Sequence, residues 1–299
     1  MIREKKLTLL KKKLGERTKL DEPLGRHTTF RIGGPAALFY EVETEAELVR
    51  VVELSRAVGV PFFILGGGSN VLFNDEGFRG IVIKMENGKW KMENGKVMAE
   101  AGTPLARLVE EAVNHSFSGL EFCVGIPGTI GGAVVGNAGV KDKAIGELIE
   151  KIKVFNERGE IEYINQDDCQ FKYRTSRFQK ESGVILEVVL QLEKGEGKDI
   201  REEMLRFLET RKDQPKEPSA GSIFKNPPRQ SAGELIEQVG LKGEIVGQAQ
   251  ISEEHANWIV NLGGARCQDV LELLSLAKSK VEARFNIELE EEIQIIDEI

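Results

Sequence analysis

The chain has 299 residues, of which 40% are hydrophobic and 30% are charged, and its formal net charge is −8 at pH 7. That length and apolar fraction predict two or three compact units with a real core, and they exclude a chain that is disordered throughout. The acidic balance disfavours a general nucleic-acid binder. With no opening signal peptide and no apolar run near the roughly 20 residues that span a bilayer, a membrane protein is disfavoured too.

The first 19 residues are strongly basic, with eight lysine or arginine residues against Glu4 and Glu16. Leu7, Leu10 and Leu14 recur at helical spacing, so we expect an amphipathic leading helix. A basic arm can bind nucleic acid or anionic lipid, but a helix with a solvated charged face is the simpler interpretation.

The sequence up to residue 86 predicts a strand–helix–strand unit. Thr44 and Glu47 match a capping box that opens a helix, and Gly59 ends it. Apolar runs at 60–65 and 80–85 predict strands. Between them lies the first glycine segment, defined as residues 66–70 (GGGSN), which an extended stretch follows.

The middle of the chain combines a hairpin, a helix and a second run of glycines. Asn94-Gly95 between two short alternating stretches predicts the hairpin. Thr103 and Pro104 predict the cap and first turn of a helix that runs to about residue 116. The second glycine segment, residues 125–139 (GIPGTIGGAVVGNAG), is expected to be a mostly apolar loop. Strands are predicted at 151–155, 161–164 and 184–192.

Beyond a polar linker at 194–198, helices dominate the prediction. Asp199 with Glu202 predicts the cap of a helix to residue 212, and Ser231 opens a short helix that Gly240 closes. Apolar alternation at 287–296 predicts a terminal strand. The longest helix covers 268–285 and is expected to face inward through Val270, Leu271, Leu274, Ala277 and Val281. This mixture indicates an α+β fold.

Glycine is over-represented, at 32 residues, and both glycine segments suggest ligand contact. In the first segment, glycines free backbone N–H groups to turn toward a pyrophosphate, and Ser69 and Asn70 can add side-chain bonds. Neither the Rossmann spacing nor a Walker loop is present. A tight structural turn remains the alternative. The second segment suits close approach to a large, partly apolar ring such as a flavin, with glycine-rich helix packing as the alternative.

Polar groups gather in three further stretches, which are residues 171–178, residues 219–227 and the terminal strand. Arg174 could hold a substrate carboxylate in fork geometry, although a surface ion pair is the alternative for each arginine in its stretch. Ser222 has no adjacent base or nucleophile elbow, so it fits a proton donor better than a nucleophile. The third stretch is the terminal strand, with Glu288, Glu290, Glu291 and Glu292.

Histidine and cysteine are scarce, at three residues each. Cys123, Cys169 and Cys267 form neither a CxxC pair nor a disulfide framework, which favours the reducing cytoplasm. The three histidines leave little material for a metal site, and no metal is expected.

Several motifs occur in the order found in one family. They are HTTFRIGG (27–34), LGGGSNVL (65–72), GIPGTIGGAVVGNAG (125–139), YRTSRF (173–178), GSIFKNP (221–227) and L-x-x-E-I-x-I-I (289–296). From about Leu20 onward the chain closely resembles the UDP-N-acetylenolpyruvoylglucosamine reductases, flavoenzymes of bacterial peptidoglycan precursor synthesis. The glycine segments alone would indicate only the wider flavin fold of vanillyl-alcohol-type oxidases. The short passage from Arg177 to Ser222 resembles the subtype that lacks an extra substrate-covering loop.

The resemblance implies that FAD binds non-covalently between two N-terminal domains, that NADPH reduces it, and that the enolpyruvyl sugar then receives hydride. It implies cofactor contacts from Gly66, Gly67, Gly68, Ser69, Asn70, Thr129, Ile130, Gly131, Gly132 and Asn137. Ser222 matches the family's proton donor, and Arg174 and Glu292 match the residues that stabilise the enolate-like intermediate. Substrate contacts are implied for Tyr173, Arg177, Lys225 and Asn226. Motif position favours Glu292 over Glu291, but three adjacent glutamates leave the register open by one residue.

The resemblance also implies a domain layout. We expect a basic arm (1–20), two FAD-binding domains (21–86 and 87–196) and a substrate-binding domain (197–299). The substrate would be UDP-N-acetylglucosamine enolpyruvate, and the protein would act as a cytoplasmic monomer without nucleic-acid or membrane partners. The alternatives are another FAD enzyme of the same fold that oxidises a small alcohol or lactone, or a non-enzymatic nucleotide-binding module.

Overall fold

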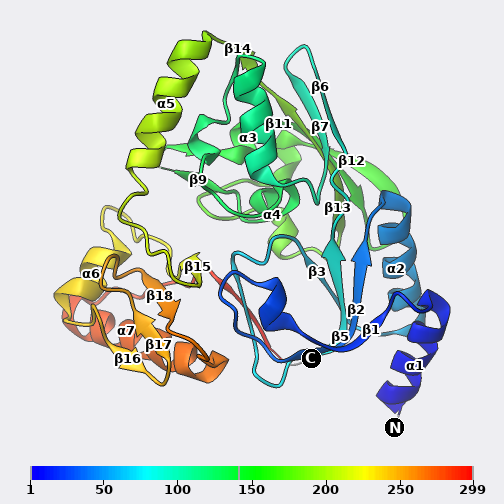
Figure 1. The fold of residues 1–299 in the computed structure, drawn as a ribbon, viewed down its shortest axis with the longest axis horizontal. Helices are drawn as coiled ribbons and strands as arrows, with labels where there is room; N and C mark the ends of the chain where they lie inside the picture. The colour runs from blue at the N-terminus through cyan, green and yellow to red at the C-terminus, as the bar shows by residue number, and fades with distance from the viewer. Residues whose placement is uncertain (1, 141, 298–299) are drawn as a thin grey trace. The chain divides into compact units, whose positions relative to one another are not determined.

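The computed structural model describes residues 2–140 and 142–297 and confirms a mixed α+β architecture (Figure 1). Its α-helices are α1 (Ile2–Leu14), α2 (Glu45–Val58), α3 (Leu105–Asn114), α4 (Ile130–Val135), α5 (Gly197–Glu209), α6 (Ala232–Gln238) and α7 (Cys267–Phe285). Within the described ranges, none of these helices is long and apolar enough to cross a membrane.

The chain divides by its contacts into two compact units, each assembled from separate stretches of sequence. Unit 1 comprises Met1–Arg17, Tyr40–Gly67 and Ile83–Lys212, and unit 2 comprises Thr18–Phe39, Gly68–Val82 and Asp213–Ile299. The predicted domain boundaries after residues 86 and 196 both lie inside unit 1. The two units therefore do not coincide with the predicted domains. The division into consecutive domains stays a prediction.

Unit 1 is built on an antiparallel sheet (Figure 1). Its strands, in spatial order, are β12 (Ile161–Asn165), β11 (Ile149–Phe155), β13 (Val184–Gln191), β7 (Lys96–Glu100) and β6 (Trp90–Glu93). The central strand β13 is buried at every position except Glu187 and Gln191, which explains its nearly continuous apolar sequence. Helix α4 packs on β13 and β7. Small two-stranded pairs accompany this sheet: β8 (Phe117–Ser118) with β14 (Glu193–Lys194), and β9 (Gly139–Val140) with β10 (Lys143–Ala144).

A second sheet has the spatial order β1 (Lys19–Pro23), β2 (Pro35–Val42), β5 (Phe78–Met85) and β3 (Phe62–Leu65). Helix α2 begins as predicted, because the Thr44 hydroxyl accepts the Glu47 N–H, and it ends at Gly59 in the left-handed conformation. The predicted leading helix is also present as α1, with Leu10 fully buried.

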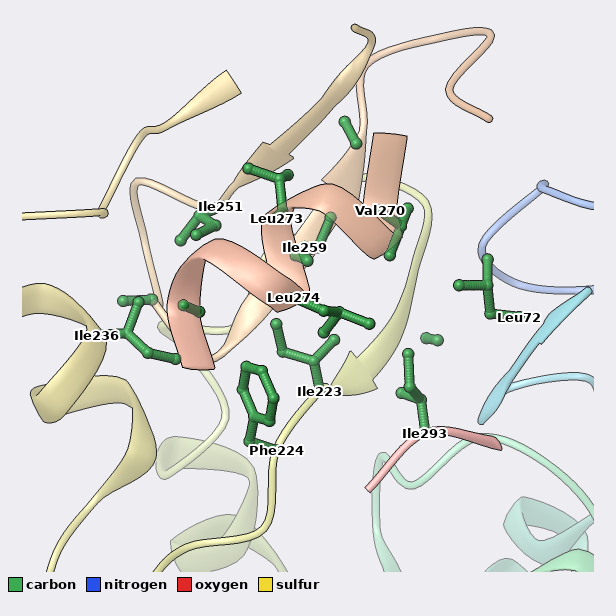
Figure 2. Close-up of a cluster of buried hydrophobic side chains, with 14 of the residues drawn as sticks. Leu72, Ile223, Phe224, Ile236, Ile251, Ile259, Val270, Leu273, Leu274 and Ile293 are labelled. Atoms are coloured by element: carbon green, nitrogen blue, oxygen red, sulfur yellow. The ribbon is translucent and has the colours of Figure 1, made fainter. Parts of the chain in front are cut away.

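Unit 2 contains the sheet β15 (Ser219–Ser222), β18 (Trp258–Asn261), β17 (Ala249–Ile251) and β16 (Ile245–Val246). Figure 2 shows Val270, Leu273 and Leu274 of α7 among Ile223, Phe224, Ile251 and Ile259 in its core. Strand β19 (Gln294–Ile296) runs parallel to β4 (Val71–Phe73). The Asp75 carboxylate accepts the first N–H groups of α7, from Cys267 (2.7 Å) and Gln268 (3.1 Å), and so caps the helix.

Several local predictions were wrong. Helix α3 starts one residue later than a Thr103 cap requires, and α5 starts at Gly197 without the Asp199 cap. The second glycine segment is not a loop throughout, because it contains α4. The terminal strand is shorter than predicted. On α7, Leu273 is buried and Leu271 only partly so, because the apolar face is rotated slightly from the predicted one.

Other local predictions are confirmed. The Asn94-Gly95 hairpin joins β6 to β7, with Glu93 opposite Lys96. Ser231 caps α6 by accepting the Glu234 N–H. Strands β11, β12 and β13 occupy the predicted ranges. The hairpin and the Ser231 cap depend on residues that are close together in the sequence.

Candidate functional site

Gly66 and Gly67 of the first glycine segment approach Gly128 and Thr129 of the second inside unit 1. A Cβ atom added to Gly66 would lie 2.6 Å from the Thr129 Oγ1 atom, and one added to Gly67 would lie 2.5 Å from the Gly128 Cα atom. A side chain at Gly67 would force the two backbones apart, and one at Gly66 would displace the Thr129 hydroxyl, which accepts the Gly132 N–H. Glycine is therefore required at both positions by close approach. The structure thus joins two segments about 60 residues apart into one surface lined by backbone.

Amides of the first glycine segment are available to a ligand. The N–H groups of Gly67 and Gly68 have no acceptor among the residues that the structure describes. The carbonyl of Gly66 is held by the Lys84 ammonium at 2.6 Å. Lys84 was missed by the sequence analysis, and its only signal is a single lysine within the apolar strand β5. Lys84 is partly buried and its ammonium also lies 3.6 Å from a Glu86 carboxylate oxygen. Free amides beside this cation favour an anion such as a pyrophosphate.

Several hydrogen-bonding groups of the second glycine segment already have partners within the protein. The hydroxyl of Thr129 accepts the Gly132 N–H at 3.3 Å and caps α4. The N–H groups of Ile130 and Gly131 donate to the carbonyls of Thr103 and Ala101, both at 2.9 Å. A Cβ on Gly131 would clash with Ala101, so packing accounts for this glycine. Cofactor contacts from these residues remain a prediction.

The side chain of Asn137 hydrogen-bonds to two backbone groups of the protein. Its side-chain amide donates to the Lys172 carbonyl at 2.8 Å and accepts the Gly146 N–H at 3.0 Å. Ser176, which is buried, donates to the Val135 carbonyl at 2.7 Å. These two bonds fix the turn at 172–176 to the end of α4. Asn137 therefore positions this turn in the structure, and the cofactor contact implied for it stays a prediction.

Arg174 lies at the tip of that turn. Lys172 and Thr175 exchange backbone hydrogen bonds of 3.0 Å in both directions, and Arg174 has a φ of 52°. A positive φ is uncommon for a residue with a long side chain, and the paired backbone bonds of the turn hold Arg174 in this conformation. The guanidinium lies over the Tyr173 ring, with 5.8 Å from its Cζ atom to the ring centroid. Tyr173 is 53% exposed.

Arg177 forms the surface ion pair that was the alternative for this stretch. Its Nε atom donates to the Glu181 carboxylate at 2.8 and 2.9 Å, and its Nη1 atom donates to the Asp168 carbonyl at 3.0 Å. The Glu181 carboxylate raises the pKa of Arg177. The structure thus gives Arg177 protein partners, and the substrate contact implied for it stays a prediction.

Ser222 ends strand β15 in unit 2, and the backbone after it is held firmly by Asn257. The Asn257 side chain bonds both backbone groups of Phe224, accepting its N–H at 3.1 Å and donating to its carbonyl at 2.8 Å. The Asn257 carbonyl accepts the Ile223 N–H at 3.0 Å. Asn257 is 3% exposed. It positions the segment that carries Ser222, and the sequence analysis missed it.

His255 supports this arrangement as a neutral ring. Its Nδ1 atom accepts the Asn257 N–H at 3.1 Å, so the other ring nitrogen carries the proton. Burial lowers the pKa of His255 below its usual value. Both observations argue for a structural role.

The terminal segment lies beside the Ser222 segment within unit 2. Glu292 donates its N–H to the Ile223 carbonyl at 2.8 Å, and Lys225 donates its N–H to the Glu290 carbonyl at 2.8 Å. Asn70 adds a bond from its side-chain amide to the Glu292 carbonyl at 3.0 Å. The structure therefore brings the backbones of Ser222 and Glu292 close together. It gives Asn70 a role in holding Glu292.

The two candidate glutamates point to different surroundings. Glu291 lies between the buried residues Leu289 and Ile293, and its carboxylate pairs with Lys278 of α7 at 2.9 Å. Alternation along an extended chain directs Glu292 to the opposite face. The ion pair with Lys278 thus gives Glu291 a structural function, and the catalytic role of Glu292 stays a prediction.

Lys225 and Asn226 are partly engaged as well. The Lys225 ammonium forms an ion pair with Glu290 and is largely shielded from solvent. The Asn226 side chain accepts the Ala232 N–H at 3.0 Å, at the start of α6. Both lie in the segment that follows Ser222, so a ligand at this segment could reach them.

Metal and thiol chemistry find no support in the part of the chain that the structure describes. Its histidine, cysteine and acidic residues form no cluster suited to a metal ion. The three cysteines are free and buried. Burial raises the pKa of Cys169 to about 11 and that of Cys267 to about 12, so both thiols are protonated at neutral pH.

Two family models match this chain. One, described as an FAD binding domain, matches residues 36–165. The other, described as the C-terminal domain of UDP-N-acetylenolpyruvoylglucosamine reductase, matches residues 213–296. The two glycine segments fall in the first match and Ser222 and Glu292 in the second.

Known proteins are similar over almost the whole chain. A protein of Alkaliphilus oremlandii named UDP-N-acetylenolpyruvoylglucosamine reductase is 42% identical over 283 residues, which is 93% of each chain. One of the same name from Syntrophomonas wolfei is 39% identical, covering 95% of this chain and 96% of the relative. The crystal structure of the Thermus caldophilus enzyme matches with a TM-score of 0.80 and 40% identity, covering 93% of this chain and 97% of that one.

Proposed function

The chain belongs to the UDP-N-acetylenolpyruvoylglucosamine reductase family, and on that premise we propose how its own residues serve the reaction. It reduces UDP-N-acetylglucosamine enolpyruvate to UDP-N-acetylmuramate with NADPH, through FAD, in peptidoglycan precursor synthesis. This is the reaction that the sequence motifs imply.

When bound, FAD supplies the transfer of hydride from NADPH to the enolpyruvyl group. The first glycine segment would hold its pyrophosphate, with the backbone around Gly128 and Thr129 beside it. Support comes from the amides of Gly67 and Gly68, which have no acceptor among the described residues, and from the close approach of the two segments. The first segment contains no histidine or cysteine, so it offers no atom for covalent attachment.

Three residues are proposed to act on the substrate. Arg174 binds the carboxylate, and its charge stabilises the negative charge that develops there. Ser222 gives its hydroxyl proton to the carbon next to the carboxylate. Glu292 stabilises the same developing charge, which requires its acid form, because only a protonated carboxyl can donate a hydrogen bond. Tyr173, Lys225 and Asn226 are proposed to contact the rest of the substrate.

The observation that carries this proposal is the backbone pairing in unit 2. The Glu292 N–H bonds the carbonyl of the residue that follows Ser222, and Asn257 fixes the same segment from its own side. A hydroxyl and a carboxyl are thereby presented by rigid neighbouring segments. His255, which follows in the same unit, accepts the Asn257 N–H through its Nδ1 atom, and this supports Ser222 as a proton donor rather than an activated nucleophile.

We further propose that the enzyme is a cytoplasmic monomer without nucleic-acid or membrane partners. Its three free, buried cysteines fit a reducing compartment. Its net charge of −8 does not favour binding to nucleic acid or to anionic lipid.

A simple preparation tests the cofactor. The natively purified protein is expected to show the visible absorbance of oxidised flavin, and acid precipitation should release that flavin into the supernatant as intact FAD. The reason is that the contacts proposed for it are hydrogen bonds and packing alone. Flavin that remains on the precipitated protein, or a protein that stays colourless after incubation with FAD, would count against the proposal.

A further inference from the structure

Lys84 is a partly buried lysine in unit 1 that the reaction as described does not use. It lies near the end of β5, between the buried residues Ile83 and Met85, and its side chain is only 16% exposed. In the sheet, β5 is the neighbour of β3, which ends at Leu65 directly before the first glycine segment. The Lys84 side chain therefore starts from a strand beside the one that leads into this segment.

The Lys84 ammonium binds the first peptide group of the first glycine segment. Its Nζ atom donates to the Gly66 carbonyl oxygen at 2.6 Å. It lies farther, at 3.6 Å, from a carboxylate oxygen of Glu86, whose side chain is 52% exposed. Hydrogen bonds from charged donors are stronger than those from neutral ones. The shorter contact with Gly66 therefore holds this carbonyl in one direction.

That bond also fixes the direction of the Gly67 N–H. The peptide bond between Gly66 and Gly67 is trans, and in a planar trans peptide the carbonyl and the following N–H point in opposite directions. Because the carbonyl is turned toward Lys84, the N–H is turned away from it. This N–H has no acceptor among the residues that the structure describes. A cation bound to the carbonyl polarises the peptide group, which makes its N–H a better donor.

Packing restrains the same peptide group from the second glycine segment. A Cβ atom on Gly66 would lie 2.6 Å from the Thr129 Oγ1 atom, and one on Gly67 would lie 2.5 Å from the Gly128 Cα atom. Contacts this close leave the peptide little room to rotate. A donor that is already fixed costs less to order when its ligand binds. The Gly67 N–H is thus held in place before any anion arrives.

We propose that Lys84 is a positioning residue for the cofactor, because it holds the Gly66 carbonyl so that the Gly67 N–H is directed at an oxygen of the FAD pyrophosphate. The inference rests on the proposed function and adds to it a residue that acts through the backbone. A lysine that only linked the two strands would stabilise the fold without changing the surroundings of the phosphates. The two roles therefore predict different results for bound FAD.

The test compares Lys84→Met, which removes the ammonium and keeps an apolar stem, with Lys84→Arg, which keeps a charged donor. Lys91→Met is the matched control, because Lys91 is an exposed lysine on β6 of the same unit. Two quantities are measured. They are the dissociation constant of FAD for the apoprotein, from flavin fluorescence, and the phosphorus NMR chemical shifts of the pyrophosphate in the FAD-loaded protein.

Lys84→Met should raise the dissociation constant of FAD about 10-fold or more, because the hydrogen bond from the Gly67 N–H is no longer prepared. It should also shift at least one phosphate resonance of the bound FAD, since the surroundings of the phosphates change. Lys84→Arg should fall between wild type and Lys84→Met, and Lys91→Met should match wild type in both measurements.

Unchanged affinity together with unchanged phosphate resonances in Lys84→Met would overturn the inference. A raised dissociation constant with unshifted resonances would also overturn it, because Lys84 would then only support the fold, and so would an equal change in Lys91→Met. If Lys84→Met does not fold or takes up no FAD, Lys84→Gln, which keeps a polar end group, is judged by the same two criteria. Failure of the proposed function is distinguishable, because the wild-type protein itself would then bind no FAD.

Discussion

Replacing Ser222 with alanine is expected to slow oxidation of the NADPH-reduced enzyme by the enolpyruvyl sugar about 10²-fold or more, while reduction by NADPH proceeds at its normal rate. The reason is that only the second half-reaction needs a proton on the carbon beside the carboxylate. Stopped-flow absorbance of the flavin, with each half-reaction started separately in the absence of oxygen, measures both rates.

Ser275→Ala is the matched control, because it removes an exposed hydroxyl from α7 in the same unit. It should leave both rates at the wild-type value. If Ser222→Ala also leaves both rates unchanged, Ser222 is not the proton donor. If it slows both half-reactions equally, the hydroxyl supports the site in general and does not act in one step.

The second large effect is expected at Glu292. Glu292→Ala should lower kcat about 10²–10³-fold, as the removal of one group that stabilises developing negative charge does in other enzymes. Glu292→Gln should recover part of this loss, because the amide can still donate a hydrogen bond. Steady-state kinetics with the enolpyruvyl sugar measure these changes.

Glu291→Ala is the neighbouring control. It should keep kcat near wild type and lower the midpoint of thermal unfolding slightly, since it breaks the half-buried pair with Lys278. The opposite pattern, with the large loss of kcat at Glu291 and none at Glu292, would mean that Glu291 rather than Glu292 is the active carboxyl group.

The features that could be predicted best from the sequence are those formed by residues close together along the chain. The cap of α2 at Thr44, the Asn94-Gly95 hairpin and the Ser231 cap involve residues at most three apart. The two compact units could not be predicted in this way, because each is assembled from stretches far apart in the chain. Asp75, for example, caps a helix that begins 192 residues later.

The candidate site shows the same limit. Motif resemblance could nominate Ser222, Arg174 and Glu292, because it compares residue types in order. It could not find Lys84 or Asn257, whose importance lies in the backbone groups that they contact. Nor could it show that the side chains of Asn137 and Arg177, which were nominated with the others, hydrogen-bond to other residues of the protein. Contacts of this kind appear only when the chain is folded.

The central claim is that one protein oxidises NADPH and passes the hydride to an enolpyruvyl sugar through a bound flavin. The most direct measurement follows the flavin absorbance of the purified protein without oxygen, first on adding one equivalent of NADPH and then on adding UDP-N-acetylglucosamine enolpyruvate. We expect the absorbance to bleach in the first step and to return in the second, with UDP-N-acetylmuramate formed in equal amount. Absorbance that bleaches but does not return with the enolpyruvyl sugar would contradict the claim.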